Sequence, residues 1–244
     1  MKVLINGAAG RMGKEVVKLC EEGFASSSVA AKIDKIGGEY LSLDAFSGEA
    51  DVIVDFSHHT CASEVCDYAV KRNIPVVIAT TGHTEEEKAI IKSAAEKTAI
   101  FYSGNMSVGI AVLRKLVKAA VAAFPSANVE IVETHHNRKL DAPSGTALML
   151  ADSVKAVRPD AYEVYGREGQ SKRDPNEIGM HSLRYGNIVG IHEVFISTDA
   201  ETITLKHEAH SRAVFAEGAL VAAGYMVGKK SGLYAMEDLL RDKE

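Results

Sequence analysis

A glycine-rich loop directly after the first apolar run constrains the fold of this chain more than any other feature. Residues 7–13 read G-x-x-G-x-x-G and lie between an expected strand, residues 2–6, and an expected helix that begins near Met12. Glycines there let backbone N–H groups approach a pyrophosphate, and the positive end of the helix dipole favours that charge. The motif alone also fits a glycine-rich turn without a ligand, so the neighbouring sequence must show whether it binds a dinucleotide.

The context is an alternation of short apolar runs and helical patterns over the first hundred residues. The expected strands are residues 2–6, 28–33, 51–55, 75–79 and 99–102. These runs do not alternate strictly between polar and apolar residues, which is typical of parallel strands buried on both faces. A long helix is expected over residues 107–124 and ends at Pro125. The sequence therefore predicts a Rossmann-type parallel sheet with the glycine loop at its first strand-to-helix turn.

The pattern changes after Asn128. A strand at 129–134 and a helix from about Ser144 precede a glycine-, proline- and charge-rich stretch, 158–179, which we expect to be a mobile loop. Strands at 181–185, 188–197 and 202–207 are joined through Gly186-Asn187 and Asp199-Ala200, turn-forming pairs that predict antiparallel hairpins. An apolar helix, 213–227, is expected to pack back on the first domain.

The predicted fold class is therefore α/β in two domains. Residues 1–104 plus 212–244 would form the N-terminal Rossmann-type domain with its parallel sheet. Residues 105–211 would form a second, α+β domain that carries a mixed or antiparallel sheet.

Charge and composition narrow the functional classes. The chain has 28 basic and 33 acidic residues, a net charge of −5 and no long basic run, which argues against a nucleic-acid surface. No run approaches the ~18 apolar residues of a membrane span, and glycine follows too soon for a signal peptide. The cysteines Cys20, Cys61 and Cys66 follow no zinc spacing, so no metal site is expected. We expect a cytoplasmic protein with no nucleic-acid or membrane partner.

Polar residues follow the ends of the expected strands, where open parallel sheets bind ligands. Asp34 ends the second strand, where an acidic residue meets the ribose hydroxyls of a dinucleotide. Lys35 could receive a 2′-phosphate or be an ordinary surface lysine, so both NADH and NADPH stay open as cofactors. Three further strand ends could face a nicotinamide or simply form turns: Asp55-Phe56-Ser57, Ala79-Thr80-Thr81-Gly82 and Ser103-Gly104-Asn105-Met106.

The densest polar cluster is residues 133–147, E-T-H-H-N-R-K-L-D-A-P-S-G-T-A. His135 and His136 would point to opposite faces of a continuing strand, so both serve one site only if the chain curls into a loop there. A metal site lacks a third ligand, and a nucleophile at Ser144 lacks the G-x-S-x-G elbow. A polar loop without function is the remaining alternative to a cationic, proton-donating pocket. That pocket would use the two imidazoles, Lys139 and the N–H groups of a helix start at 144–146 to bind an anionic substrate.

Together these motifs resemble those of the 4-hydroxy-tetrahydrodipicolinate reductases of bacterial lysine biosynthesis, also called dihydrodipicolinate reductases. The similar segments are residues 7–13, 54–57, 80–82, 105–109 and, most specifically, 133–147. Ala79 departs from the family pattern, which commonly has glycine there. The resemblance implies NAD(P)H-dependent reduction of 4-hydroxy-tetrahydrodipicolinate, via dihydrodipicolinate, to tetrahydrodipicolinate. It also implies a homotetramer assembled through the sheets of the second domain.

The resemblance further implies individual roles. His135 would be the proton donor and acceptor and Lys139 a proton donor, while His136, Lys139, Ser144, Gly145 and Thr146 would bind the substrate. The implied cofactor positions are Gly7, Ala8, Ala9, Gly10, Arg11, Met12, Asp34, Lys35, Ala79, Thr80, Thr81, Ser103, Gly104, Asn105 and Met106.

Two alternatives remain. Another two-domain dehydrogenase, acting on homoserine, diaminopimelate or a similar amino acid or aldehyde, would share the fold but not the H-H-x-x-K loop. A non-catalytic dinucleotide sensor would keep the glycine loop and have no reason to keep the acids and anion clamps together.

Overall fold

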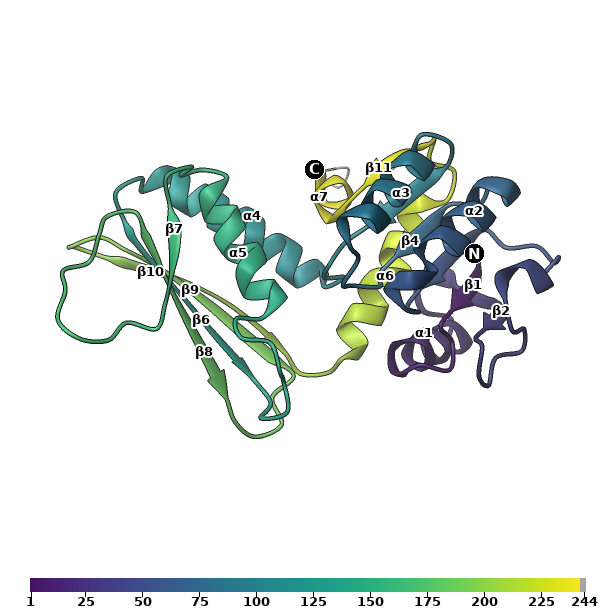
Figure 1. The fold of residues 1–244 in the computed structure, drawn as a ribbon, viewed down its shortest axis with the longest axis horizontal. Coiled ribbons are helices and arrows are strands. Elements are labelled where there is room, and N and C mark those ends of the chain that lie inside the picture. The colour runs from purple at the N-terminus through teal and green to yellow at the C-terminus, as the bar shows by residue number, and fades with distance from the viewer. Residues whose placement is uncertain (242–244) are drawn as a thin grey trace. The chain divides into compact units, whose positions relative to one another are not determined.

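The computed structural model describes residues 1–241 and divides into two compact units (Figure 1). The first unit comprises residues 1–108 together with the C-terminal segment from Arg212, and the second comprises Gly109–Ser211. The chain thus leaves the first unit once and returns to it once.

The first unit is built on a parallel six-stranded sheet of order β11-β5-β4-β3-β1-β2. Its strands are β1 (Lys2–Asn6), β2 (Ser28–Ile33), β3 (Val52–Asp55), β4 (Val76–Ile78), β5 (Ala99–Tyr102) and β11 (Gly232–Tyr234). The five strands expected from the apolar runs are all present, with ends that differ by at most one residue. The sixth, β11, was not predicted.

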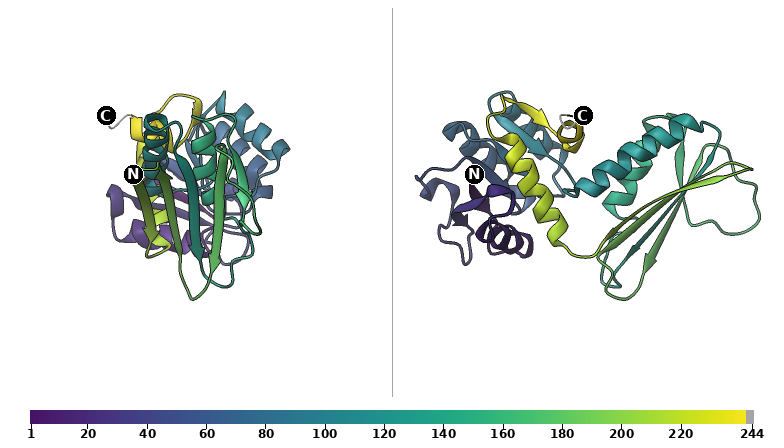
Figure 2. Two further views of the ribbon diagram at one scale, coloured as in Figure 1. Left: turned by 90° about the vertical axis from the view of Figure 1, so that its left-hand side faces the viewer. Right: turned by 180° about the vertical axis from the view of Figure 1, so that it is seen from behind.

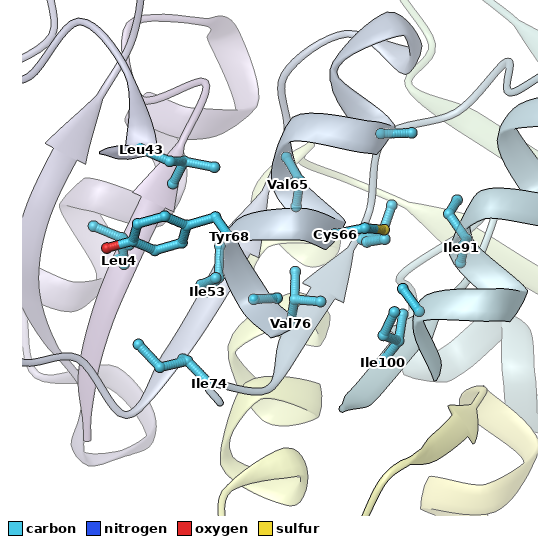
Figure 3. Packing of buried hydrophobic residues seen from close by; sticks show 14 of the residues in the cluster. Leu4, Leu43, Ile53, Val65, Cys66, Tyr68, Ile74, Val76, Ile91 and Ile100 are labelled. Carbon is cyan, nitrogen blue, oxygen red and sulfur yellow. The ribbon is translucent and has the colours of Figure 1, made fainter. Parts of the chain in front are cut away.

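The helices of this unit are α1 (Arg11–Glu21), α2 (Ala62–Arg72), α3 (Glu85–Ala95), α6 (Ala213–Met226) and α7 (Met236–Arg241). Short 3-10 turns occur at Phe24–Ser26, Leu43–Ala45 and His59–Cys61. A cluster of buried apolar side chains joins the sheet to α2 and α3 (Figure 3). It includes Leu4, Ile53, Val76 and Ile100 from four strands and Val65, Tyr68 and Ile91 from the two helices. Burial of each large side chain contributes about 1.5–3 kcal/mol to the stability of the fold. The packed core therefore holds in place the strands whose ends carry the polar residues.

The helix α6 contacts β3, β4 and β5 and also packs against α1. Its sequence is apolar on all sides, as expected for a helix enclosed by its neighbours, and Ala216, Leu220 and Ala223 are completely buried. The expectation that the segment 213–227 returns to the first unit is confirmed.

The second unit has a mixed five-stranded sheet of order β10-β9-β6-β8-β7. The strands are β6 (Asn128–His135), β7 (Tyr162–Tyr165), β8 (Glu177–Arg184), β9 (Gly190–Ser197) and β10 (Thr202–Ala209). The helices α4 (Val108–Ala123) and α5 (Gly145–Lys155) cover one face of this sheet (Figure 2). Val117, Leu150, Ile131 and Val194 belong to the core between the helices and the sheet. The predicted α+β architecture with a mixed sheet is confirmed.

The order of the strands corrects one predicted hairpin. Gly186-Asn187 joins β8 to β9, but these strands are not neighbours, because β6 lies between them and pairs in parallel with β8 and antiparallel with β9. The connection crosses the end of β6, where the N–H of His136 donates to the carbonyl of Ile188 at 2.8 Å. A turn signal shows that the chain reverses and leaves open which strand it then pairs with. The other predicted hairpin, β9 to β10 through Asp199-Ala200, is confirmed.

The expectation of a mobile loop over 158–179 is wrong for part of that stretch. β7 forms within it as an edge strand in parallel with β8, and β8 itself already begins at Glu177. Arg158 links the two ends of the stretch, because it donates to the carbonyls of Ala127 and Pro175 at 2.8 and 2.6 Å. Within residues 1–241, the structure has no helix that is long and apolar enough to cross a bilayer.

Candidate functional site

The glycine loop connects β1 to α1 and has the geometry that a dinucleotide requires. Gly7 has a positive φ of 79°, and a Cβ there would stand 2.5 Å from the carbonyl oxygen of Phe56. A Cβ on Gly13 would stand 2.0 Å from the carbonyl oxygen of Gly7, so the loop passes directly over the first turn of the helix. Gly10, the N-cap, provides no side-chain cap, and the first turn holds no acidic residue. The first N–H groups of α1 are therefore available to an anion, as the pyrophosphate interpretation requires.

Asp34 ties the glycine loop to the turn after β2. One carboxylate oxygen accepts the N–H of Ala9 and the other accepts the N–H of Ile36, both at 3.0 Å. Both oxygens keep further lone pairs, so the carboxylate can still accept hydrogen bonds from ribose hydroxyls. Lys35 is exposed beside it. The adjoining surface has a cavity of about 530 Å³ whose lining includes Ala9, Ile36, Gly37, Lys14, Lys18 and Lys32.

The other strand ends are held together by a buried carboxylate, Asp55, at the end of β3. It accepts hydrogen bonds from the Asn6 amide at 2.7 Å, the Ser57 hydroxyl at 2.6 Å and the Thr80 hydroxyl at 2.7 Å. Burial raises the pKa of Asp55, and these hydrogen bonds oppose that effect. Asp55 therefore links the ends of β1, β3 and β4, which are adjacent in the sheet, and two of these strands, β1 and β4, precede predicted cofactor residues.

The predicted cofactor residues differ in exposure. Thr81 and Gly104 are exposed, whereas Ala79, Thr80, Ser103 and Met106 are buried. The Ser103 hydroxyl donates to the carbonyl of Asn105 at 2.7 Å, which closes the turn after β5. The buried residues shape the loops, and Thr81 and Gly104 are the exposed positions among these six.

The polar cluster of the second unit lies where β6 ends. Glu133 and His135 are two residues apart on this strand, so their side chains lie on the same face, toward α5. Nδ1 of His135 lies 2.5 Å from Oε2 of Glu133, and both side chains are buried. β6 includes His135 and ends there, so His136 begins the loop in which the sequence required the chain to curl.

Glu133 has further partners from two other elements. Arg184, the last residue of β8, donates from Nη1 and Nη2 to the two carboxylate oxygens at 2.8 and 2.6 Å. The N–H of Ser144 donates to Oε1 at 3.1 Å. Burial alone would raise the pKa of Glu133, but the hydrogen bonds from His135 and Arg184 outweigh it and hold that pKa well below its usual range. Glu133 is therefore an ionised carboxylate inside the fold.

A second buried histidine, His192 of β9, lies next to this pair. The rings of His135 and His192 are 5.2 Å apart, edge to face. Nε2 of His192 lies 3.1 Å from the Ser144 hydroxyl, which in turn accepts the N–H of Ala147 at 3.2 Å as the N-cap of α5. Burial, followed by the charge of His135, lowers the pKa of His192 to about 3, so this ring is neutral at physiological pH.

The remaining predicted substrate residues lie around this centre. Lys139 forms an ion pair with Asp141 at 2.8 Å. Its charge contributes to the lowered pKa of His192, after burial and the larger effects of His135 and His207. Gly145 and Thr146 open α5, and a Cβ on Gly145 would meet no atom within 4 Å. Ser144 is almost completely buried, with its N–H bound by Glu133 and its hydroxyl by His192 and Ala147. A cationic, substrate-binding surface at Lys139 and the start of α5 remains a prediction.

Sequence reasoning did not assign roles to Arg184, His192 or Glu133. His192 occupies an inward position of β9 that alternates with Val194 and Ile196, so a polar residue at a core position was the available signal. No sequence signal indicated Arg184, because its contact with Glu133 depends on the pairing of β6 with β8. Within residues 1–241, no group of three or more His, Cys, Asp or Glu side chains could hold a metal ion.

Comparison with known proteins gives the same family for both halves of the chain. Residues 1–106 match the family described as "Dihydrodipicolinate reductase, N-terminus", and residues 109–240 match "Dihydrodipicolinate reductase, C-terminus". The 4-hydroxy-tetrahydrodipicolinate reductase of Caldanaerobacter subterraneus subsp. tengcongensis is 47% identical over 99% of this chain and 98% of its own. The enzyme of the same name from Clostridium novyi is 41% identical over 99% of both chains.

Solved structures agree with this assignment. Dipicolinate-bound dihydrodipicolinate reductase from Paenisporosarcina sp. TG-14 is 25% identical, has a TM-score of 0.78 and covers 96% of this chain and 97% of its own. The diaminopimelate dehydrogenase of C. glutamicum shares only the fold, at 12% identity and a TM-score of 0.56, with 98% of this chain and 93% of its own covered. The chain therefore belongs to the dihydrodipicolinate reductase family, oxidoreductases with an N-terminal domain that binds NAD(P)H.

Proposed function

We propose that this protein reduces 4-hydroxy-tetrahydrodipicolinate to tetrahydrodipicolinate in the cytoplasm, as a step of lysine and diaminopimelate biosynthesis. Loss of water first gives dihydrodipicolinate, which then accepts a hydride and a proton. The observation that carries this proposal is the buried Glu133-His135 pair beside an open helix start and Lys139, in a chain whose two halves both match one reductase family. In this proposal, residues 1–104 plus 212–244 bind the cofactor, and residues 105–211 bind the substrate and form the oligomer.

When bound, NADH or NADPH supplies the hydride. The backbone of residues 7–12 and the first turn of α1 would hold the pyrophosphate, and Asp34 and Lys35 would contact the adenosine ribose or its 2′-phosphate. Residues 79–81 and 103–106 would line the nicotinamide end. Thr80, Ser103 and Met106 would act there through their backbone, since their side chains are buried.

The substrate carries two ring carboxylates, and the second unit offers two kinds of anion clamp. Lys139 can form a charge-assisted hydrogen bond with one carboxylate. The N–H groups at the start of α5, at Gly145 and Thr146, can bind the other, and His136 would complete the pocket. Ser144 supports this clamp as the N-cap, because its own N–H and hydroxyl are already engaged.

After hydride addition, the ring is an enamine that must receive a proton on carbon. A histidine is suited to that step, because imidazole gains and loses protons near neutral pH. His135 would donate the proton, and Lys139 would supply protons beside it. A non-catalytic sensor would need neither group.

Turnover tests the proposal directly. The condensation product of aspartate semialdehyde and pyruvate, formed in a coupled assay, should cause oxidation of NADH or NADPH by the purified protein. His135→Gln should lower kcat by roughly 10² or more with a modest change in KM, as expected for a lost general acid. His210→Gln replaces an exposed histidine of the same unit and should retain full activity. Absence of turnover by the wild-type protein, or near-wild-type kcat in His135→Gln, would contradict the proposal.

The proposed oligomer is a homotetramer that forms through the second-unit sheets. The sheet face opposite α4 and α5 carries the partly exposed Val132, Ile191 and Phe195 and the 46% exposed Leu183, without a covering helix among the described residues. Light scattering should give four times the chain mass of 26.1 kDa. Phe195→Glu should reduce that mass by opposing association, and a wild-type monomer would exclude the tetramer.

A further inference from the structure

The carboxylate of Glu133 is surrounded by hydrogen-bond donors from three elements. Oε2 lies 2.5 Å from Nδ1 of His135 and accepts Nη1 of Arg184 at 2.8 Å. Oε1 accepts Nη2 of Arg184 at 2.6 Å and the N–H of Ser144 at 3.1 Å. Arg184 is anchored in turn by the carbonyl of Asp141, to which Nη2 donates at 2.7 Å. None of these contacts requires the Glu133 carboxyl group to donate a hydrogen bond.

This arrangement determines which nitrogen of His135 carries a proton. An ionised carboxylate only accepts hydrogen bonds, so Nδ1 must be the donor in its contact with Oε2. The neutral ring then has Nδ1 protonated and Nε2 free to take or release a proton. A carboxylate that orients a histidine in this way acts through the ring and not on the substrate.

Gly190 keeps the other nitrogen of the ring clear. The first residue of β9 lies beside the ring, and a Cβ at this position would stand 3.0 Å from Nε2 of His135. The φ of Gly190 is not positive, so the backbone would accept any residue there. Space next to Nε2 is therefore the physical reason for a glycine at this position.

We propose that Glu133 and Arg184 are positioning residues, which hold His135 with a proton on Nδ1 and leave Nε2 to exchange the second proton with the substrate. This inference rests on the proposed function. In the step itself, hydride addition has left an enamine whose ring nitrogen is deprotonated and negatively charged. Its carbon forms a bond to the proton of Nε2, the N–H electron pair returns to Nε2, and the lone pair of the ring nitrogen closes the C=N bond of the neutral imine. His135 enters the step doubly protonated and leaves it neutral, with Nδ1 still bound to Glu133.

Glu133→Gln tests the proposal with little change in volume. The amide has one acceptor and one donor group, so its NH2 must oppose donors that the carboxylate accepts. We expect kcat to fall about 10- to 100-fold while KM changes less than about threefold, because Glu133 does not touch the substrate. Arg184→Met should also lower kcat, and Arg184→Lys should recover part of it. The control is Glu201→Gln, which removes an exposed carboxylate from the turn between β9 and β10 of the same unit and should leave kcat within twofold of wild type.

Nitrogen-15 NMR of histidine-labelled protein gives a readout that does not depend on turnover. The wild-type spectrum at neutral pH should show His135, assigned by its loss in His135→Gln, with the proton on Nδ1. Glu133→Gln should shift that signal toward the other tautomer, and Glu201→Gln should not.

A wild-type proton on Nε2 would overturn the positioning role even if the Glu133 variant failed to fold. Unchanged kcat in a folded Glu133→Gln protein would do the same. Failure of the wild-type protein to reduce the substrate would instead remove the proposed function, while the tautomer would still decide whether Glu133 orients the ring.

Discussion

Asp34 accepts the backbone N–H of Ala9 at 3.0 Å, so the residue predicted to meet the cofactor ribose also holds the pyrophosphate loop in place. Its second oxygen holds Ile36 and thereby the turn that presents Lys35. The negative charge of Asp34 repels a 2′-phosphate, while Lys35 attracts it. The lining of the adjoining cavity includes three lysines, Lys14, Lys18 and Lys32. Its one carboxylate, Glu21, pairs with Lys32, so the lining keeps a net positive charge.

From this balance we predict that kcat/KM for NADH and NADPH will agree within about tenfold, since each contact at an exposed site is worth on the order of 1 kcal/mol. Lys35→Ala should reduce kcat/KM for NADPH several-fold and leave that for NADH nearly unchanged. Added salt should weaken NADPH more than NADH.

Lys97→Ala is the matched control for this prediction. Lys97 is an exposed lysine that precedes β5, which is separated from β2, the strand before Lys35, by three strands of the parallel sheet. Equal losses for both cofactors in Lys35→Ala would show that Lys35 does not meet the phosphate. A wild-type preference beyond roughly 10³-fold, or about 4 kcal/mol, would mean that this pair does not set cofactor choice.

The first five strands of the first unit could be predicted from sequence because each is a short apolar run, and the prediction did not depend on the order in which they pair. The pairing of β6 with β8 could not, because it joins residues about fifty positions apart. The alternation in Gly190–Ser197 indicates a strand with one buried face but not its partner. β7 was missed because the pattern Y-E-V-Y is short and lies among charged and glycine residues, which favour a loop.

The candidate site could be predicted only in part, because a sequence pattern shows residues that are close along the chain but not contacts between distant strands. Residues 133–147 are local in sequence, and their polar density marked His135 and Lys139 as chemically important. The side chain that completes the charge balance, Arg184, reaches Glu133 from another strand. Two residues that are two positions apart on a strand lie on the same face, as Glu133 and His135 do. The sequence does not show that the strand continues as far as His135, so it could not establish this relationship.

Gly190→Ala tests the need for space beside His135. The added Cβ would stand 3.0 Å from Nε2, closer than ordinary contact, so the imidazole has to move by a few tenths of an ångström. We predict at least a tenfold fall in kcat, since small displacements of a proton donor weaken transfer strongly. Gly224→Ala is the control, because its Cβ would meet the Met1 side chain at an ordinary 3.9 Å. Equal kcat for the Gly190 variant and the wild-type protein would show that the space is not used.

Lys139 should affect both binding and catalysis, because one ammonium group would bind a carboxylate and supply protons. Lys139→Ala should raise KM, lower kcat and weaken binding of pyridine-2,6-dicarboxylate, a planar dicarboxylate. Its ion pair with Asp141 is partly exposed, so loss of this pair should cost less than about 1 kcal/mol of stability. Lys206→Ala, which removes another lysine paired with carboxylates in the same unit, should change none of these quantities. A Lys139 variant that changes thermal stability alone would indicate a structural loop.

His192 makes the stability of the protein depend on pH. The folded-state pKa of about 3 lies below the ordinary value of 6.5, because burial and then the charge of His135 disfavour the protonated ring. Below pH 6.5 the unfolded chain therefore binds a proton that the folded chain does not, and stability falls as pH decreases from 6.5 toward 3. Between pH 7 and pH 5 this amounts to about 2 kcal/mol, at 1.36 kcal/mol for each pH unit below 6.5.

We predict that His192→Gln will remove this part of the pH dependence. The glutamine side chain can still form a hydrogen bond with the Ser144 hydroxyl, which lies 3.1 Å from Nε2 of His192, but glutamine does not titrate. Urea denaturation at pH 7 and pH 5 measures the free energy of unfolding at each pH. Between these pH values it should fall by about 2 kcal/mol more in the wild-type protein than in the variant. For His210→Gln, which replaces an exposed histidine, the free energy of unfolding should fall by as much as in the wild-type protein. Other titrating groups cancel in this difference, so equal losses in wild type and His192→Gln would mean that His192 accepts a proton in the folded state.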